Sequence, residues 1–149
     1  MNDTSTNLGE VTYTRIYDAP RELLFRCMIE PEHLTHFWGP VGMSTPIENI
    51  LVEPRVGGRF EMVMVDDATG AEYASKGVFV ELDEPSKIVW SEPDVEGGMT
   101  TSIIFNDLGD GRTEAVTHQT NVPEMYRTPE AQAGMTSSFD RLVAYLATR

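Results

Sequence analysis

Three polar side chains, two near the middle of the chain and one in its last third, could carry acid–base chemistry. His118 lies in an alternating segment between Val116 and Thr120, and its ring faces the protein interior if those two neighbours do. An imidazole exchanges protons near neutral pH, and Tyr73 or Glu72 could serve as its acid–base partner. A lone histidine in a strand can equally be a hydrogen-bonded structural residue, so both interpretations stay open at this stage.

A second group of chemically capable residues lies near the first third of the chain. His33 and His36 are three residues apart with Glu30 and Glu32 beside them, a spacing that can place two imidazoles on one helix face. No third ligand is signalled, so we expect neither a metal ion nor another cofactor. Cys27 lies in an apolar helical stripe, which predicts a buried structural thiol.

Large apolar side chains at particular points suggest a binding surface for an apolar molecule. Phe37 and Trp38 precede Gly39-Pro40, where they could gate a cavity or simply pack in the core. Methionine thioethers suit a wall that accepts varied apolar shapes, although core filling is the alternative. The predicted ligand-binding residues are Phe37, Trp38, Met62, Met64, Trp90, His118, Met135 and Phe139.

The elements that would position these residues follow from periodicity. A strand with two mixed faces begins at Glu10, and two short helices are expected over residues 21–30 and 32–37. The middle of the chain alternates between short strands and turns, as in an antiparallel meander. The further strands are expected over residues 47–53, 59–65, 72–82, 87–91, 100–105 and 113–120.

The last element is a long helix over residues 128–148. Met135, Phe139, Leu142 and Leu146 recur at helical spacing and form one apolar stripe. A helix of about 20 residues is about 30 Å long and needs a large apolar surface to cover it. The inner face of a curved sheet offers that surface, so we predict an α+β fold with about six or seven strands wrapped around this helix.

Composition narrows the classes of partner. The chain has 149 residues, of which 11 are Lys or Arg and 24 are Asp or Glu, giving a net charge of −13. Such a charge repels phosphate backbones and anionic lipids, which argues against nucleic-acid and membrane partners. One cysteine and no leader pattern are typical of a cytoplasmic protein. We expect a disordered tail over residues 1–8 and one domain over residues 9–149.

Several short motifs, taken in order, carry a resemblance that spans almost the whole chain. They are Asp18-Ala19-Pro20-Arg21-Glu22-Leu23-Leu24-Phe25, Pro31-Glu32-His33-Leu34, Phe37-Trp38-Gly39-Pro40, Val56-Gly57-Gly58-Arg59-Phe60 and Asp140-Arg141-Leu142. The sequence resembles the SRPBCC (START-like, pollen-allergen-like) superfamily, and within it the homologues of the activator of heat-shock protein 90 ATPase. The resemblance implies a helix-grip fold with a cavity between the sheet and the C-terminal helix.

Three functions are compatible with these observations. The leading hypothesis is a non-enzymatic domain that holds a small, mostly apolar ligand in that cavity, because no complete catalytic set is evident. One alternative is a stress-response interaction module that binds a chaperone. Another is a cyclase- or hydrolase-type enzyme using His118 with Tyr73 or Glu72. The sequence leaves monomer and homodimer open.

Overall fold

The computed structural model describes residues 8–149. Most of the predicted tail lies outside the described residues, whereas Leu8 begins the first strand. The elements in chain order are β1 (Leu8–Tyr17), α1 (Arg21–Cys27), α2 (Pro31–Leu34), β2 (Met43–Ser44), η2 (Ile47–Asn49), β3 (Ile50–Val52), β4 (Arg59–Asp66), β5 (Glu72–Asp83), β6 (Lys87–Glu92), β7 (Met99–Asp107), β8 (Thr113–Pro123), η3 (Glu124–Tyr126) and α3 (Pro129–Ala147).

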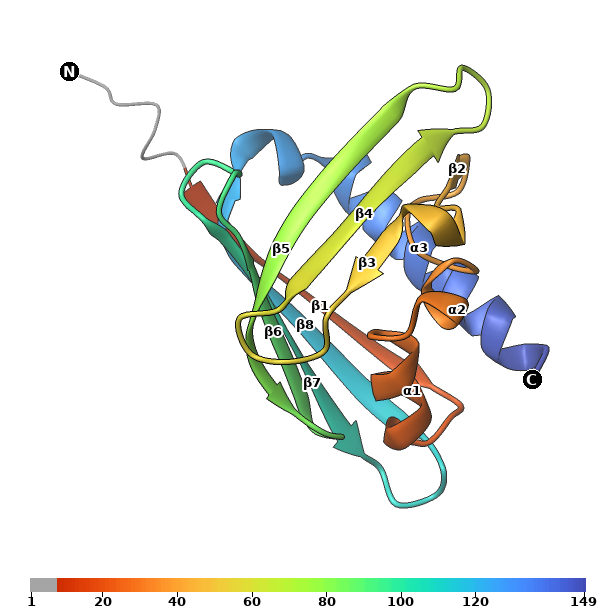
Figure 1. The fold of residues 1–149 in the computed structure, drawn as a ribbon. Coiled ribbons are helices and arrows are strands. Elements are labelled where there is room, and N and C mark those ends of the chain that lie inside the picture. Colours follow the sequence, from red (N-terminus) through yellow and green to blue (C-terminus); the bar gives the residue numbers. More distant parts are fainter. Residues whose placement is uncertain (1–7) are drawn as a thin grey trace.

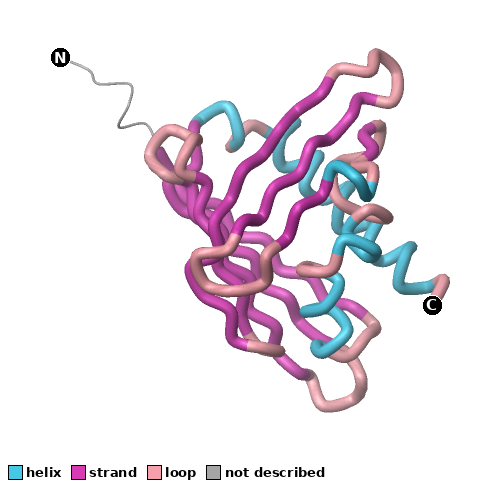
Figure 2. Tube along the Cα trace, in the orientation of Figure 1, coloured by secondary structure: helices cyan, strands magenta, loops and turns pink. Residues whose placement is uncertain are grey.

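The strands form one antiparallel sheet that curves around α3 (Figure 1). Its order is β1-β8-β7-β6-β5-β4-β2, and β3 pairs with β4. Sequential strands from β4 to β8 are neighbours because turns of few residues join them, while β1 closes back onto β8. Figure 2 shows the three short helical segments of the first half gathered at one side of the sheet.

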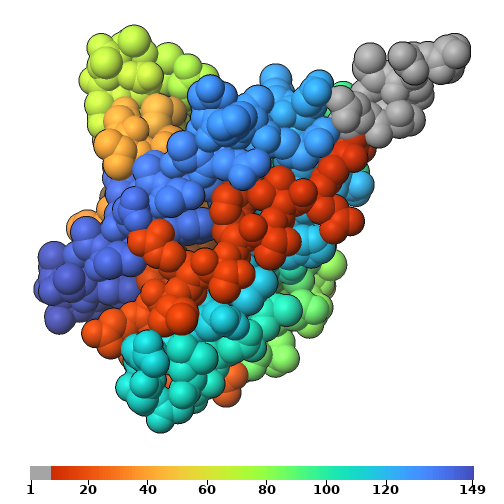
Figure 3. Space-filling view, turned by 180° about the vertical axis from the view of Figure 1, so that it is seen from behind, coloured from red at the N-terminus to blue at the C-terminus, as the bar shows by residue number. Residues whose placement is uncertain are grey.

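Helix α3 covers the inner, concave face of the sheet, is capped at its N-terminus and is bonded to β1. The Thr128 side chain accepts a hydrogen bond from the Ala131 N–H at 3.1 Å, a typical helix N-cap. Arg15 of β1 donates to Asp140 of α3 at 2.6 Å. Figure 3 shows β1 and α3 running side by side on the far side of the molecule.

The predicted α+β helix-grip fold is confirmed, with local differences. The expected strand over residues 47–53 is split, because Pro46 caps the single turn η2 and only Ile50–Val52 is extended. The second short helix ends at Leu34, before the predicted limit. Among residues 8–149, no helix is both long and apolar enough to cross a membrane.

Candidate functional site

One end of the inner face is closed by ordinary core packing. Leu24 of α1 is 1% exposed and Leu142 of α3 is 5% exposed. The strands fill the space between them with buried inner-face side chains, namely Phe60, Phe79, Ile88, Trp90, Ile103, Phe105 and Ala115. Because interiors are close-packed, a ligand could enter this end only by displacing side chains.

An aromatic cluster lies where the closed end gives way to the rest of the inner face. Trp38, Phe60 and Trp90 meet with ring centroids 4.9–6.2 Å apart. Gly77 of β5 makes room for the Trp90 indole, since a Cβ at that position would lie 3.1 Å from Trp90 Cδ1. Trp38 is half-buried, so the cluster has one open edge.

The first three turns of α3, up to Phe139, contain no buried side chain, unlike the following turn with Leu142. Met135 and Phe139 on α3 are half-buried, and so is Met64, which β4 places on the inner face in line with Phe60. Phe139 packs edge-on against Tyr13 of β1, with ring centroids 5.5 Å apart. Large apolar side chains that remain partly open on a concave surface are typical of a binding site.

Polar groups lie on the same inner face near this half-open region. Gln119 of β8 donates to the Thr101 hydroxyl of β7 at 3.2 Å. Glu92 shares the inner face of β6 with Trp90, and burial raises the pKa of its carboxyl group, although a hydrogen bond from Trp90 opposes that shift. This surface therefore combines apolar walls with amide, hydroxyl and carboxyl groups that could orient a ligand.

The segment over residues 37–45, called the strap here, is bonded to α3 by side chains of the helix. Ser138 donates to the Phe37 carbonyl at 3.1 Å, and Ser137 accepts a backbone N–H of the strap at 3.1 Å. The two N–H bonds of Arg141 Nη1 are shared among four strap carbonyls, those of Trp38, Gly39, Pro40 and Met43, at 2.8–3.4 Å. The strap thereby holds Trp38 over the aromatic cluster.

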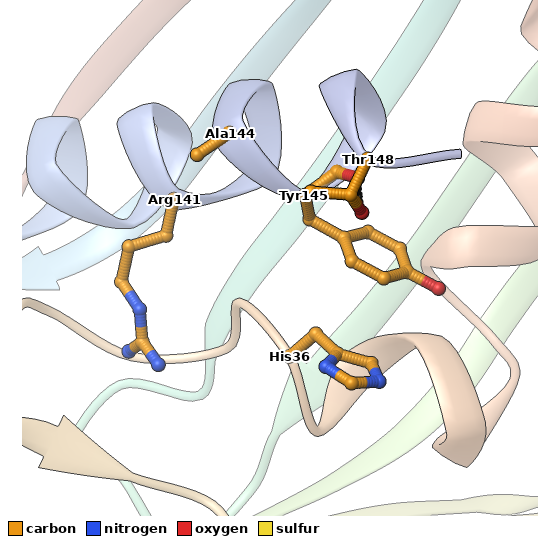
Figure 4. A pocket seen from close by; sticks show the side chains of 5 residues that line it. All are labelled: His36, Arg141, Ala144, Tyr145 and Thr148. Atoms are coloured by element: carbon orange, nitrogen blue, oxygen red, sulfur yellow. Dashed lines mark hydrogen bonds between the residues drawn. The ribbon is translucent and has the colours of Figure 1, made fainter.

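A hollow of about 360 Å³ lies at the C-terminal end of α3 (Figure 4). Its wall consists of His36, Arg141, Ala144, Tyr145 and Thr148. The His36 and Tyr145 rings stack with centroids 4.7 Å apart and an interplanar angle of 11°. Figure 4 shows the Arg141 guanidinium on one side of the hollow and these two rings on the other.

Buried His33 joins α2 to α3 rather than pairing with His36. Its Nδ1 lies 2.6 Å from the Tyr145 hydroxyl, and its Nε2 lies 3.3 Å from Glu30 Oε1. Burial lowers the pKa of His33, and the nearby Arg149 acts in the same direction. Within the described part of the chain, no group of three or more His, Cys, Asp or Glu residues could hold a metal ion.

A second hollow, of about 400 Å³, lies over β3, β4 and β5 on the outer side of the sheet, where Leu51, Glu61 and Lys76 are neighbours. Neither hollow lies between the inner face and α3. An enclosed cavity beneath α3 therefore stays a prediction, while the half-open surface there is observed.

The structure divides the predicted ligand-binding residues into three sets. Phe37, Met62 and Trp90 are buried members of the core cluster, at 3%, 2% and 7% exposure. The half-buried set is Trp38, Met64, Met135 and Phe139. His118 forms the third set, because it lies on the outer face of the sheet.

The expectation that His118 faces the interior is wrong. Residues alternate between faces along a strand, and Thr117, next to His118, is buried on the inner face opposite Tyr13 and Ile103. His118 is therefore on the outer face, where its Nε2 lies 2.8 Å from Glu10 Oε1.

The predicted acid–base partners do not meet His118. Tyr73 pairs with Met64 and so belongs to the inner face, although its side chain is 52% exposed. Glu72 pairs with Val65 on the outer face, but β5 and β8 are three strand spacings apart, or about 14 Å. General acid–base work needs hydrogen-bond reach, which this arrangement lacks.

Several residues of the site were not singled out from the sequence. Glu92 ends β6 and Gln119 lies within β8, and both segments have ordinary strand sequences. Arg141 appeared only within a motif, and its partners lie about a hundred residues earlier in the chain. The spacing of Arg141, Ala144, Tyr145 and Thr148 on one helix flank was the signal available in the sequence.

A curved antiparallel sheet around a C-terminal helix, with an apolar inner face that is partly open, defines a helix-grip domain. The family model described as Activator of Hsp90 ATPase homolog 1-like protein matches residues 18–147. The chain belongs to this family.

Solved structures of similar shape come from several bacteria. Protein CV1439 from Chromobacterium violaceum is 25% identical, with 91% of this chain and 95% of that chain covered and a TM-score of 0.82. Protein NE0264 from Nitrosomonas europaea is 21% identical over 99% and 98%, with a TM-score of 0.82. The AHSA1-like protein from Aeromonas hydrophila is 17% identical over 93% and 92%, with a TM-score of 0.79. No curated protein matches the sequence.

Proposed function

We propose that this domain binds a small, mostly apolar molecule on the inner face of the sheet, beneath the N-terminal half of α3. The observation that carries the proposal is the half-buried state of Trp38, Met64, Met135 and Phe139 on one concave surface. A bound ligand would remove this apolar surface from water, which stabilises the complex by about 25 cal/mol for each Å² buried.

The polar groups at the same surface set the expected character of the ligand. Gln119 offers an amide oxygen that can accept, since its Nε2 is engaged with Thr101. Glu92, whose pKa is raised by burial, can donate when protonated or accept when ionised. We therefore favour an apolar molecule with one hydroxyl or amine end over a purely hydrocarbon one.

Binding is favoured over catalysis because the residues proposed for acid–base work lie apart. His118 is on the outer face and Tyr73 is on the inner face. A binding surface needs shape and one or two polar anchors, whereas a catalytic site needs groups within hydrogen-bond reach of one another. A cytoplasmic location is part of this proposal.

Intrinsic fluorescence can test the proposal, since the chain has two tryptophans and both belong to the aromatic cluster. We would titrate straight-chain alcohols and aromatic phenols and follow emission together with the thermal midpoint. A saturable emission change with a raised midpoint is expected.

Two matched variants locate the binding surface. Met135→Lys should abolish the response, because it places a cation on the apolar wall. Met125→Lys alters a methionine that is 67% exposed in η3 and should bind normally. Equal responses from both variants, or no response to any compound from the unaltered protein, would refute the proposal.

A second candidate is a chaperone-binding role, which the family's printed description suggests. One surface feature favours it. Ile16 and Ile104 on the outer face are 50% and 41% exposed, and Val116 of the intervening strand pairs with Ile104 and lies diagonally across from Ile16, since its partner on β1 is Thr14. Pull-down with a bacterial Hsp90 homologue, comparing Ile104→Ser with the unaltered protein, tests this role. Retention that is insensitive to Ile104→Ser would exclude this face.

A further inference from the structure

The guanidinium of Arg141 uses only one of its three nitrogens to hold the strap. Nη1 donates to the four strap carbonyls, with the Gly39 oxygen nearest at 2.8 Å. Nε and Nη2 have no hydrogen-bond partner among residues 8–149, and neither nitrogen is sealed from solvent. Nε–H and one Nη2–H point the same way and match two oxygens of a carboxylate or phosphoryl group.

The hollow lies beside the Nε–Nη2 edge of Arg141, and its wall contains this positively charged side chain and no acidic one. The lining residues are His36, Arg141, Ala144, Tyr145 and Thr148, in a chain with 24 acidic and 11 basic residues. Asp140, which precedes Arg141, is already paired with Arg15 at 2.6 Å. An anion entering the hollow would therefore meet an oriented guanidinium with no acidic side chain among the lining residues.

The other polar groups of the wall are already engaged or are donors. The Tyr145 hydroxyl is bonded to His33 Nδ1 at 2.6 Å and accepts from Arg149 at 3.1 Å, so the tyrosine presents its ring. The Thr148 hydroxyl donates to the Tyr145 carbonyl at 2.7 Å. The His36 side chain makes no hydrogen bond to the described residues, and its imidazole carries an N–H in either tautomer.

We propose that this hollow is a binding site for a small oxyanion, a carboxylate or a phosphoryl group, seated on the Nε–Nη2 edge of Arg141. The volume of about 360 Å³ leaves room for a compact body beside the oxyanion, resting on Ala144 and the Tyr145 ring. The site shares no lining residue with the inner-face surface and stands or falls independently of it.

The test is an NMR titration of the ¹⁵N-labelled full chain with inorganic phosphate and, separately, with benzoate. Ionic strength and pH are held constant, with chloride as the balancing anion. We expect saturable shifts of the Ala144, Tyr145 and Thr148 amides at millimolar concentrations of at least one probe. Shifts with phosphate but not with benzoate would indicate a phosphoryl ligand, and shifts with benzoate but not with phosphate would indicate a carboxylate. Shifts with neither probe, or equal shifts with chloride, would overturn the proposal.

Variants test whether binding depends on the planar geometry of the Arg141 guanidinium or only on its positive charge. Arg141→Lys keeps the charge but loses the planar fork, and should weaken binding about tenfold. Ala144→Glu puts a carboxylate beside the guanidinium and should abolish probe binding, while Val143→Glu adds the same charge at the adjacent exposed position and should retain most of it. If Arg141→Lys fails to fold, the Ala144→Glu and Val143→Glu pair decides. Unchanged binding in Ala144→Glu would contradict the site.

Discussion

Two successive turns of α3 should respond differently when a large side chain is removed. Leu142, in the C-terminal half, is 5% exposed and packs against the core cluster. Phe139, one turn earlier, is half-buried, and its ring contact is with Tyr13. If the inner face is open beneath the N-terminal half of α3, removing the smaller side chain, that of Leu142, should lower the free energy of unfolding more than removing the larger one of Phe139.

The expected magnitudes follow from burial. Leu→Ala in a closed core costs about 3–4 kcal/mol, because the lost transfer free energy is joined by the cost of a cavity that cannot collapse. A fully buried Phe→Ala would cost about 3–5 kcal/mol. Phe139 loses only part of that burial and leaves no sealed void, so about 1–2 kcal/mol is expected, including its edge-on contact with Tyr13.

The assay is urea unfolding of the unaltered protein, Leu142→Ala and Phe139→Ala, followed by far-UV circular dichroism. If the slope of the unfolding free energy against urea concentration is comparable in all three proteins, differences between their urea midpoints report differences in stability. A loss for Phe139→Ala equal to or larger than that for Leu142→Ala would refute the reasoning. It would mean that α3 is packed onto the sheet along its whole length, with no surface left for a ligand.

Three other outcomes are expected. Burial lowers the pKa of His33 below 6.5, so the unfolded chain binds the proton more readily than the folded one. The free energy of unfolding should therefore fall as the pH drops below about 6.5. His33→Gln should remove this part of the pH dependence, measured by urea unfolding at pH 5–8. Burial raises the pKa of the Cys27 thiol to about 11, so at pH 8 a disulfide reagent should react slowly with the native protein and fully after denaturation. Gly58→Ala should cost about 3 kcal/mol in urea unfolding, because its Cβ would overlap the Glu53 carbonyl oxygen, whereas Gly134→Ala in α3 meets only ordinary contacts and should not destabilise.

The sheet and the long helix could be predicted because their patterns are local. Alternation placed six strands within a few residues of their observed limits, and helical spacing placed α3. The two-residue strand Met43–Ser44 was missed because two residues carry no period. Ile47 looked like the start of a strand, but Pro46 begins a helical turn there.

The face of β8 could not be predicted, and His118 was misplaced with it. From Thr113 to Thr120, the large apolar residue of the strand is Val116, which suggested that Val116 and His118 face inward. In the structure Val116 pairs with Ile104 on the outer face, while Ala115 and Thr117 are buried on the inner one. A strand with small residues inside and a valine outside inverts the usual inference from hydrophobicity.

The position of Trp38 depends on a residue that sequence analysis had no reason to connect with it. Gly39 has a φ of +95° and Pro40 has no N–H, so this part of the strap can extend neither a helix nor a strand. Its carbonyl groups need other partners, and two of them have one within the strap: the Trp38 carbonyl accepts from the Thr45 hydroxyl and the Pro40 carbonyl from the Met43 N–H, both at 3.1 Å. Arg141 Nη1 adds a donor within 2.8–3.4 Å of four strap carbonyls, so a side chain about a hundred residues later helps to fix the backbone that carries Trp38. The same guanidinium lines the hollow at the end of α3. An anion bound at its free edge would therefore restrain the group that holds the aromatic cluster in place.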